Sequence, residues 1–250
     1  MYLGMITAAE LVTAFVNAEA GMVIHALILF LLLNHSMLLG PLAVPPSGQL
    51  SPQPARVLVA VLALLPLLRF FSLTMPTREV SPYFWYLLIG APLLTAIVLV
   101  ARYIHYSPVD AGIWRWSQQQ GVLAAAGLPL GVIAYLSFHR IPVVESHEIP
   151  YLIIGAGILV VFLGLVEELI FRALIQSHLC AIYGGTRGVV ITAALSAVFS
   201  SGSRSPVTML FTFVVALGFG WVVYTERSIM GVAIAHGLIG IVTILVMPNL

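Results

Sequence analysis

The chain has 250 residues, of which 61% are hydrophobic and 8% are charged, and its formal net charge is +1. Soluble domains carry charge on about a quarter of their residues, so this composition excludes an ordinary soluble protein and indicates one embedded in a membrane. The ten basic residues are scattered singly, which excludes nucleic acid as a partner. Cys180 is the only cysteine, so neither an intrachain disulfide nor a cysteine metal cage can form.

Long apolar runs recur from one end of the chain to the other. A helix needs about 20 apolar residues to cross about 30 Å of hydrocarbon, and about eight runs approach that length. They are Met22–Leu39, Val57–Leu73, Tyr83–Ile104, Gly121–Phe138, Ile149–Val166, Gly188–Ser200, Val207–Tyr224 and Ile229–Met247. We therefore predict an all-α polytopic bundle of about eight transmembrane helices, or about seven if the fifth run continues toward Tyr183. No long polar interval separates the runs, so residues 1–250 should form a single membrane domain.

Local signals mark segments inside that domain. Residues 1–20 alternate apolar and polar positions at helical spacing, which predicts an interfacial segment before the N-terminal helices of residues 22–148. Gly127 and Gly131 lie one turn apart and would let two helices approach closely. Three prolines lie inside predicted spans, where they should kink the helices. These are Pro66, Pro92 and Pro129.

The densest polar cluster inside apolar sequence consists of Glu167, Glu168 and Arg172. A charged side chain at the bilayer centre costs ~2.5–3.5 kcal/mol on insertion scales, so these groups must pair, face water or lie near the membrane edge. Glu168 and Arg172 are four residues apart on a helix and can meet, whereas Glu167 lies about 100° around the axis. Glu167 is then free to accept a proton from water, or else the cluster merely clamps two helices or marks a helix end. Spacing alone leaves these alternatives open.

Histidines form the other polar positions inside the apolar runs. His236 lies alone in the last run, where a neutral imidazole can bind a metal, ligate a pigment or fill a packing position. His25 and His35, with Asn34, form a polar island in the first run. Interhelical hydrogen bonding is the favoured explanation for this island. The alternative is axial ligation of a chlorophyll-type or haem pigment by His25 or His35.

The pattern Glu167-Glu168-xxx-Arg172, followed by His236 in a glycine-rich final span, resembles the CPBP family of CAAX proteases and bacteriocin-processing enzymes. The resemblance implies that residues 149–247 form CPBP-like core helices. Active members of the family are intramembrane metalloproteases. The resemblance therefore implies that Glu167 activates water, that Glu168 and Arg172 form supporting pairs, and that His236 belongs to the metal site.

Two positions depart from the motifs of that family. Ser203 stands where the FxxxH segment has its histidine, and Gly240 stands where the HxxxN segment has its asparagine. A catalytic zinc usually takes three protein ligands, and a serine hydroxyl is a poor one. His236 and Glu167 are the ligands if a metal binds, and a histidine of the first span would have to supply a third. Without it we expect no metal, no other cofactor and no hydrolysis.

These observations favour a non-catalytic CPBP-like protein that serves as an accessory, structural or assembly subunit of a larger membrane complex. By analogy with relatives in photosynthetic organisms, a photosynthetic or respiratory complex is a candidate home. The expected partners are other integral membrane proteins and the lipid bilayer, in the cytoplasmic (inner) membrane or an equivalent energy-transducing membrane. The alternative is an active zinc metalloprotease of the CAAX type. A transporter fits least well, because no inverted repeat is present.

Overall fold

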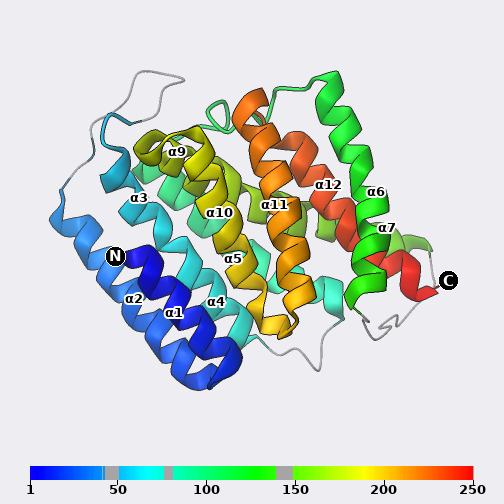
Figure 1. Cartoon of the computed structure of the whole chain (residues 1–250), viewed down its shortest axis with the longest axis horizontal. Helices are drawn as coiled ribbons and strands as arrows, with labels where there is room; N and C mark the ends of the chain where they lie inside the picture. The colour runs from blue at the N-terminus through cyan, green and yellow to red at the C-terminus, as the bar shows by residue number, and fades with distance from the viewer. Residues whose placement is uncertain (41, 43–50, 76–80, 139–148, 250) are drawn as a thin grey trace.

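A computed structural model describes residues 1–40, 42, 51–75, 81–138 and 149–249, and within these ranges it contains helices and turns but no strand (Figure 1). The elements in chain order are α1 (Tyr2–Phe15), α2 (Ala18–Leu38), α3 (Pro54–Leu62), α4 (Leu64–Thr74), α5 (Pro82–Tyr103), α6 (Gln118–Phe138), α7 (Ile149–Ile158), η1 (Leu159–Leu165), α8 (Val166–Glu168), η2 (Leu169–Gln176), α9 (Ser177–Tyr183), α10 (Gly185–Phe199), η3 (Ser200–Ser203), α11 (Pro206–Glu226), α12 (Met230–Ile241), η4 (Val242–Val246) and η5 (Met247–Asn249). The all-α bundle expected from the apolar runs is confirmed.

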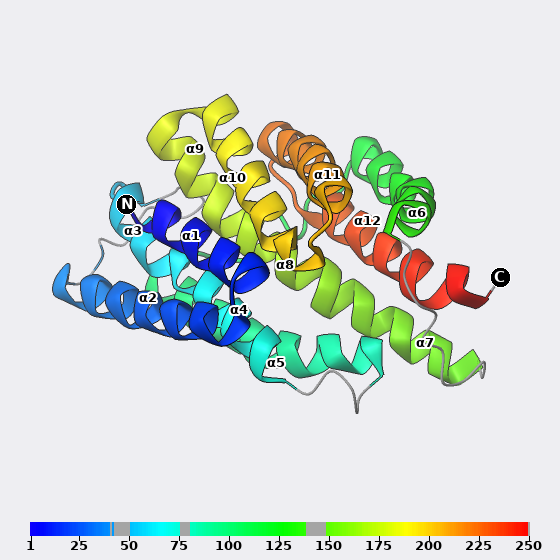
Figure 2. The ribbon, with the colours of Figure 1, turned by 60° about the horizontal axis from the view of Figure 1, so that its bottom comes forward.

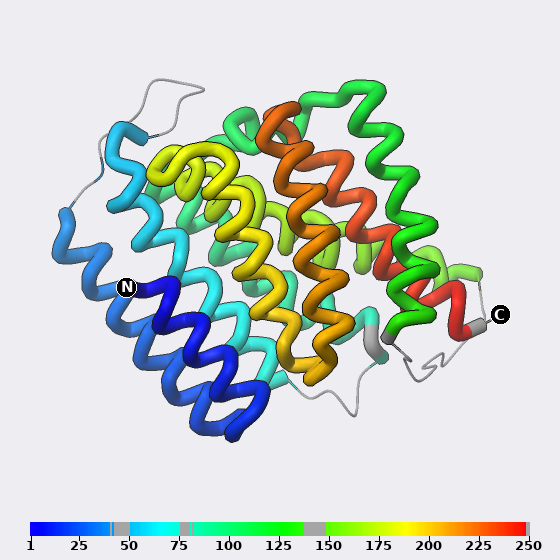
Figure 3. The backbone as a smooth tube through the Cα atoms, in the orientation of Figure 1, coloured from blue at the N-terminus to red at the C-terminus, as the bar shows by residue number. Residues whose placement is uncertain are grey.

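Six helices in the described ranges are long and apolar enough to cross a membrane. They correspond to six of the predicted runs, and the fifth continues without a break from Ile149 to Tyr183, over 35 residues. The two remaining runs form shorter helices, namely α10 and the pair α12 and η4. The chain is thus a multi-pass membrane protein, and its long and shorter helices lie together in one bundle (Figure 3).

Residues 2–15 of the N-terminal segment form a helix, as the spacing of their apolar and polar positions predicts. Helix α1 packs lengthwise against α2 (Figure 2). Its Ile6 and Ala9 are wholly buried. The contact is close because Gly21 has no side chain: a Cβ there would lie 2.7 Å from Thr13 Cα. Asn17 begins α2 by accepting a hydrogen bond from the Ala20 backbone N–H at 2.9 Å. One face of α1 is therefore packed against the bundle, and the interfacial position of residues 1–20 stays a prediction.

The predicted span at Val57–Leu73 is interrupted by one non-helical residue shortly before Pro66. Pro66 has no N–H to donate to the carbonyl of Leu62, and the helix divides at Ala63 into α3 and α4. Pro92 and Pro129 lie inside α5 and α6, which continue through them. Residues 139–148 lie outside the described residues, and so does the boundary that the sequence predicts at residue 148.

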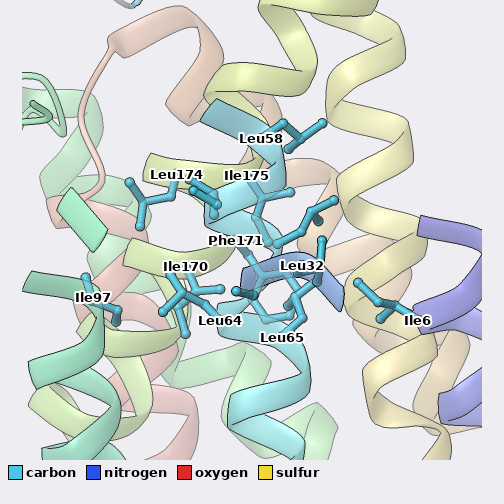
Figure 4. Close-up of a cluster of buried hydrophobic side chains, with 14 of the residues drawn as sticks. Ile6, Leu32, Leu58, Leu64, Leu65, Ile97, Ile170, Phe171, Leu174 and Ile175 are labelled. Atoms are coloured by element: carbon cyan, nitrogen blue, oxygen red, sulfur yellow. The ribbon is translucent and has the colours of Figure 1, made fainter. Parts of the chain in front are cut away.

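The long helix from Ile149 to Tyr183 passes through the middle of the bundle. Its residues 170–175 are all buried, and most of them pack with α1 to α5 in one apolar cluster (Figure 4). Lipid tails are as apolar as leucine, so helix association in a membrane depends on close van der Waals packing rather than on removal of apolar surface from water. This cluster fixes the central helix against the N-terminal helices.

Glycines bring α12 against the central helix on one side and α6 on the other. A Cβ on Gly164 would lie 2.3 Å from the Ala233 carbonyl oxygen, and one on Gly237 would lie 2.7 Å from Val160 Cα. On the α6 side, a Cβ on Gly127 would lie 2.4 Å from the Ala235 carbonyl oxygen, which confirms the close approach predicted for this position. Because these contacts flank residue 236, they set the distance between His236 and the glutamates.

Gly164→Ala should lower the free energy of unfolding in detergent by about 1–3 kcal/mol, because its methyl group would strike backbone atoms that cannot rotate away. Gly157→Ala is the matched control, since a Cβ there meets nothing within 4 Å. Thermal unfolding of the purified variants measures the difference. Equal stability of the two variants would contradict the packing described for α12.

Candidate functional site

The two glutamates of the central helix lie between two π-helical segments, and Arg172 lies within the second of them. Helices η1 and η2 flank the short α8 that carries Glu167 and Glu168. π-helical turns are rare and often occur at functional sites, because they place a wider turn where a side chain must be redirected. The two glutamates, together with Arg172 and His236, line a single cavity of about 490 Å³. Four residues singled out from the sequence are therefore brought together.

Glu168 is the most fully engaged residue of this group. Its side chain is almost completely buried, and Oε2 accepts a hydrogen bond from Arg172 Nε at 3.1 Å, as the four-residue spacing predicts. Oε1 lies 2.9 Å from His236 Nδ1, which donates the second hydrogen bond when that nitrogen carries the proton. Both carboxylate oxygens are thus occupied by donors from two different helices.

Glu167 points to a different side of the helix and is less constrained. About a third of its side chain is exposed (35%), compared with 4% for Glu168. Its Oε2 lies 3.8 Å from His236 Nε2, which is too long for a hydrogen bond but close enough for electrostatic attraction. His236 therefore stands between the two carboxylates, bonded to Glu168 and near Glu167.

The two departures from the family motifs lie on the wall of the same cavity. Ser203 ends the turn between α10 and α11, where its hydroxyl donates to the Ser200 carbonyl at 2.9 Å. The Ser205 backbone N–H donates to the same hydroxyl at 3.3 Å. A Cβ on Gly240 would lie 2.5 Å from Leu163 Cδ2, so Leu163 occupies the space that a side chain at position 240 would need. Neither position offers a strong metal ligand.

The donor set does not fit a catalytic zinc ion. Within the part of the chain that the structure describes, no group of three His, Cys, Asp or Glu side chains is close enough to hold one metal. His236 Nδ1 is already hydrogen-bonded to Glu168, which leaves His236 Nε2 and the Glu167 carboxylate as the available metal ligands. Two ligands fall short of the three protein ligands that catalytic zinc sites usually have.

The histidines of the first span lie elsewhere. His25 is wholly buried, with Nε2 3.2 Å from Glu10 Oε1. His35 Nδ1 lies 3.0 Å from the Tyr2 hydroxyl. Neither lines the cavity, so the structure does not bring a third ligand from this span. Both make contacts between α1 and α2, and pigment ligation by His25 or His35 stays a prediction.

A second ion pair, which the spacing of residues did not predict, reaches the cavity from the N-terminal helices. Arg69 of α4 lines the cavity and donates to both oxygens of Glu10, a carboxylate that is only 1% exposed. The same guanidinium donates to the Phe199 carbonyl at 2.9 Å and stands 5.3 Å from the centre of the Phe199 ring. The sequence signal was available in principle, because charges inside apolar helices need partners.

Comparison with protein families assigns the second part of the chain. The family model described as Type II CAAX prenyl endopeptidase Rce1-like matches residues 149–242. These residues form an Rce1-like domain. The domain includes both glutamates, Arg172 and His236, which confirms the CPBP resemblance for this part of the chain. No curated protein and no solved structure matches the chain.

The cavity of the Rce1-like domain is completed from outside it. Arg69 lies before residue 149 but binds the Phe199 carbonyl, next to the turn that carries Ser203. Phe199 also packs edge-on against Phe171 of the central helix, with ring centres 5.7 Å apart. The N-terminal helices therefore hold one wall of the domain's cavity through a buried ion pair.

Arg69→Met should lower the free energy of unfolding by about 3–5 kcal/mol, because it leaves the buried Glu10 carboxylate without its guanidinium. Combining it with Glu10→Gln removes the unpaired charge and should recover part of that loss. Thermal unfolding of the single and double variants in one detergent tests the coupling. A double variant less stable than Arg69→Met would show that the ion pair is not the source of the loss.

Proposed function

We propose that this chain is a non-catalytic protein of the Rce1-like family that binds other integral membrane proteins as an accessory or assembly subunit. The observation that carries the proposal is the hydrogen bonding of His236. The imidazole that an active site would need is hydrogen-bonded to Glu168. Ser203 offers only a hydroxyl that is already bonded within its turn, and Gly240 has no side chain. The described residues of the cavity wall offer fewer than the three protein ligands that a catalytic zinc usually takes.

Binding by this cavity would depend on Glu167. A partly exposed carboxylate inside a helix bundle attracts a hydrogen-bond donor from a partner helix, because an unpaired charge within a membrane protein is costly. Hydroxyl groups on the cavity wall belong to Ser72, Ser196, Ser200, Thr208, Thr212 and Thr243. Four of them already donate to backbone carbonyls, so their oxygens can accept hydrogen bonds from a polar group of a partner helix. A photosynthetic or respiratory complex in an energy-transducing membrane is the proposed home, by analogy alone.

Purification of the tagged chain from native membranes in a mild detergent tests this proposal. We expect a partner at fixed stoichiometry, and Glu167→Gln should reduce its recovery about tenfold, the effect of losing one charged hydrogen bond. Glu19→Gln is the matched control, because Glu19 is exposed at the start of α2. Migration of the wild-type chain alone, or an equal loss in both variants, would refute the proposal.

A working intramembrane protease is the second candidate, and one distance favours it. Glu167 Oε2 and His236 Nε2, the groups that the family resemblance assigns to water activation and metal binding, lie 3.8 Å apart at the cavity surface. If the chain hydrolysed peptides, Glu167 would be the group to accept a proton from an attacking water. Glu167 would then pass that proton to the leaving amine, and His236 would belong to the metal site.

Metal analysis and a cleavage assay separate the two candidates. After incubation with zinc and removal of the excess, we expect far less than one equivalent to remain bound, with no change in His236→Ala, because two donors hold zinc weakly. We expect no cleavage of a prenylated CAAX peptide. Near-stoichiometric zinc that is lost in Glu167→Ala or His236→Ala, together with cleavage by the wild type, would establish the protease and defeat the binding proposal.

A further inference from the structure

A second cavity, of about 530 Å³, lies at the end of the bundle where α9 and α11 finish. Arg172 and Gln176 of the central helix belong to its wall, and both are almost completely buried. Tyr106 and Asp110 contribute from the connection between α5 and α6, and Arg227 contributes from the end of α11. Its volume lies in the range of small-molecule sites.

Three residues of this cavity carry buried atoms without a hydrogen-bond partner. These atoms are Arg172 Nη1, Gln176 Oε1 and Asp110 Oδ1. Buried polar atoms in native proteins are nearly always paired, so unpaired ones indicate that a polar molecule belongs nearby. The opposite ends of the same side chains are bonded: Gln176 Nε2 donates to the Gly220 carbonyl at 2.8 Å, and Asp110 Oδ2 accepts from the Ser107 hydroxyl at 2.8 Å.

Hydrogen bonds between segments hold the cavity wall in place. The Tyr106 hydroxyl donates to the Ala173 carbonyl at 3.0 Å, and burial raises the pKa of this hydroxyl, so that it keeps its proton. The Ser228 hydroxyl, in the turn after α11, donates to the Gly112 carbonyl at 3.0 Å. The connection between α5 and α6 is thus tied to both η2 and the end of α11. Such a site needs little reorganisation to bind a ligand.

The outer residues of the cavity lie near the ends of apolar helices, where a membrane-spanning helix meets the lipid headgroups. The apolar helices that end beside it finish at Tyr103, Tyr183 and Glu226, so its outer residues follow the ends of membrane-spanning segments. Trp114 and Trp116, in the neighbouring connection, are 79% and 59% exposed. Exposed tryptophans at span ends are typical of the boundary between hydrocarbon and headgroups. A phospholipid is the polar molecule most abundant at this position.

The charges around the cavity select among headgroups. Arg172 and Arg227 present guanidinium groups, which bind phosphate oxygens through two parallel hydrogen bonds. Asp110 contributes a carboxylate, which repels a phosphate but attracts an ammonium group that can donate to it. A headgroup that carries both a phosphate and a primary ammonium satisfies all three side chains.

We propose that this second cavity binds the phosphoethanolamine headgroup of a phospholipid, with its phosphate facing Arg172 and Arg227 and its ammonium group facing Asp110. Arg172 bonds Glu168 through Nε, so the lipid would contact the guanidinium on the side away from the glutamates. Neither zinc nor a protein partner is involved, and the proposal does not depend on the function proposed for the first cavity.

Native mass spectrometry of the full chain, exchanged into detergent with one lipid at a time, tests the proposal. Phosphatidylethanolamine should bind about tenfold more tightly than phosphatidylglycerol, which has no ammonium group. It should exceed phosphatidylcholine similarly, because a quaternary ammonium cannot donate a hydrogen bond. Asp110→Asn should remove the preference over phosphatidylglycerol, and Arg227→Gln should weaken binding of both lipids. Arg102→Gln, which removes an exposed arginine outside the cavity, should change neither.

A competition experiment on the wild-type chain tests the proposal even if the variants fail to fold. Soluble phosphoethanolamine should displace phosphatidylethanolamine from the wild-type chain, whereas inorganic phosphate and ethanolamine at the same concentration should not. Equal binding of the three lipids would overturn the proposal, as would an equal effect of Arg102→Gln and Arg227→Gln. Displacement by inorganic phosphate alone would also overturn it, because the site would then be one for free phosphate.

Discussion

A carboxylate that is buried in an apolar helix bundle must be matched by donors, and in this chain Glu168 meets that requirement with groups from two helices. Arg172 is supplied by the same helix one turn on, and His236 is supplied by α12. The second contact requires α12 to approach the central helix closely, which the glycines at 164 and 237 permit. The packing of the domain and the chemistry of its cavity therefore depend on one hydrogen-bonded carboxylate. Between the N-terminal helices, Arg69 likewise provides a hydrogen-bond donor to the buried carboxylate of Glu10.

Much of the fold could be predicted from the sequence because a membrane-spanning helix requires a long uninterrupted run of apolar residues. Six predicted spans and the unbroken continuation after Val166 are present. The packing of α1 could not be predicted in the same way. The alternating apolar and polar positions of residues 1–20 indicate an amphipathic helix, but its Glu10 is buried against Arg69, which lies 59 residues away in sequence. A local periodicity cannot distinguish a polar face turned to water from one turned to a distant partner.

The candidate site shows the same division between local and distant information. The pairing of Glu168 with Arg172 follows from helical spacing, and the family motif placed His236 near them. Neither source indicated that His236 would bond Glu168 rather than Glu167, because that choice depends on the rotation of α12 against η1. Nor did they indicate Arg69 or the second cavity, which is assembled from three separate segments. Contacts between helices decide these features, and no single segment contains them.

The length of the central helix has a consequence for the surrounding bilayer. An α-helix of 35 residues is about 50 Å long, whereas the hydrocarbon layer is about 30 Å thick. A helix that exceeds the layer reduces hydrophobic mismatch by tilting or by thickening the bilayer around it. Because Glu167 and Arg172 lie between its two ends, the angle at which this helix crosses the membrane sets how deep both charges lie. A change in membrane thickness that alters this angle therefore also alters the depth of Glu167 and Arg172 in the bilayer.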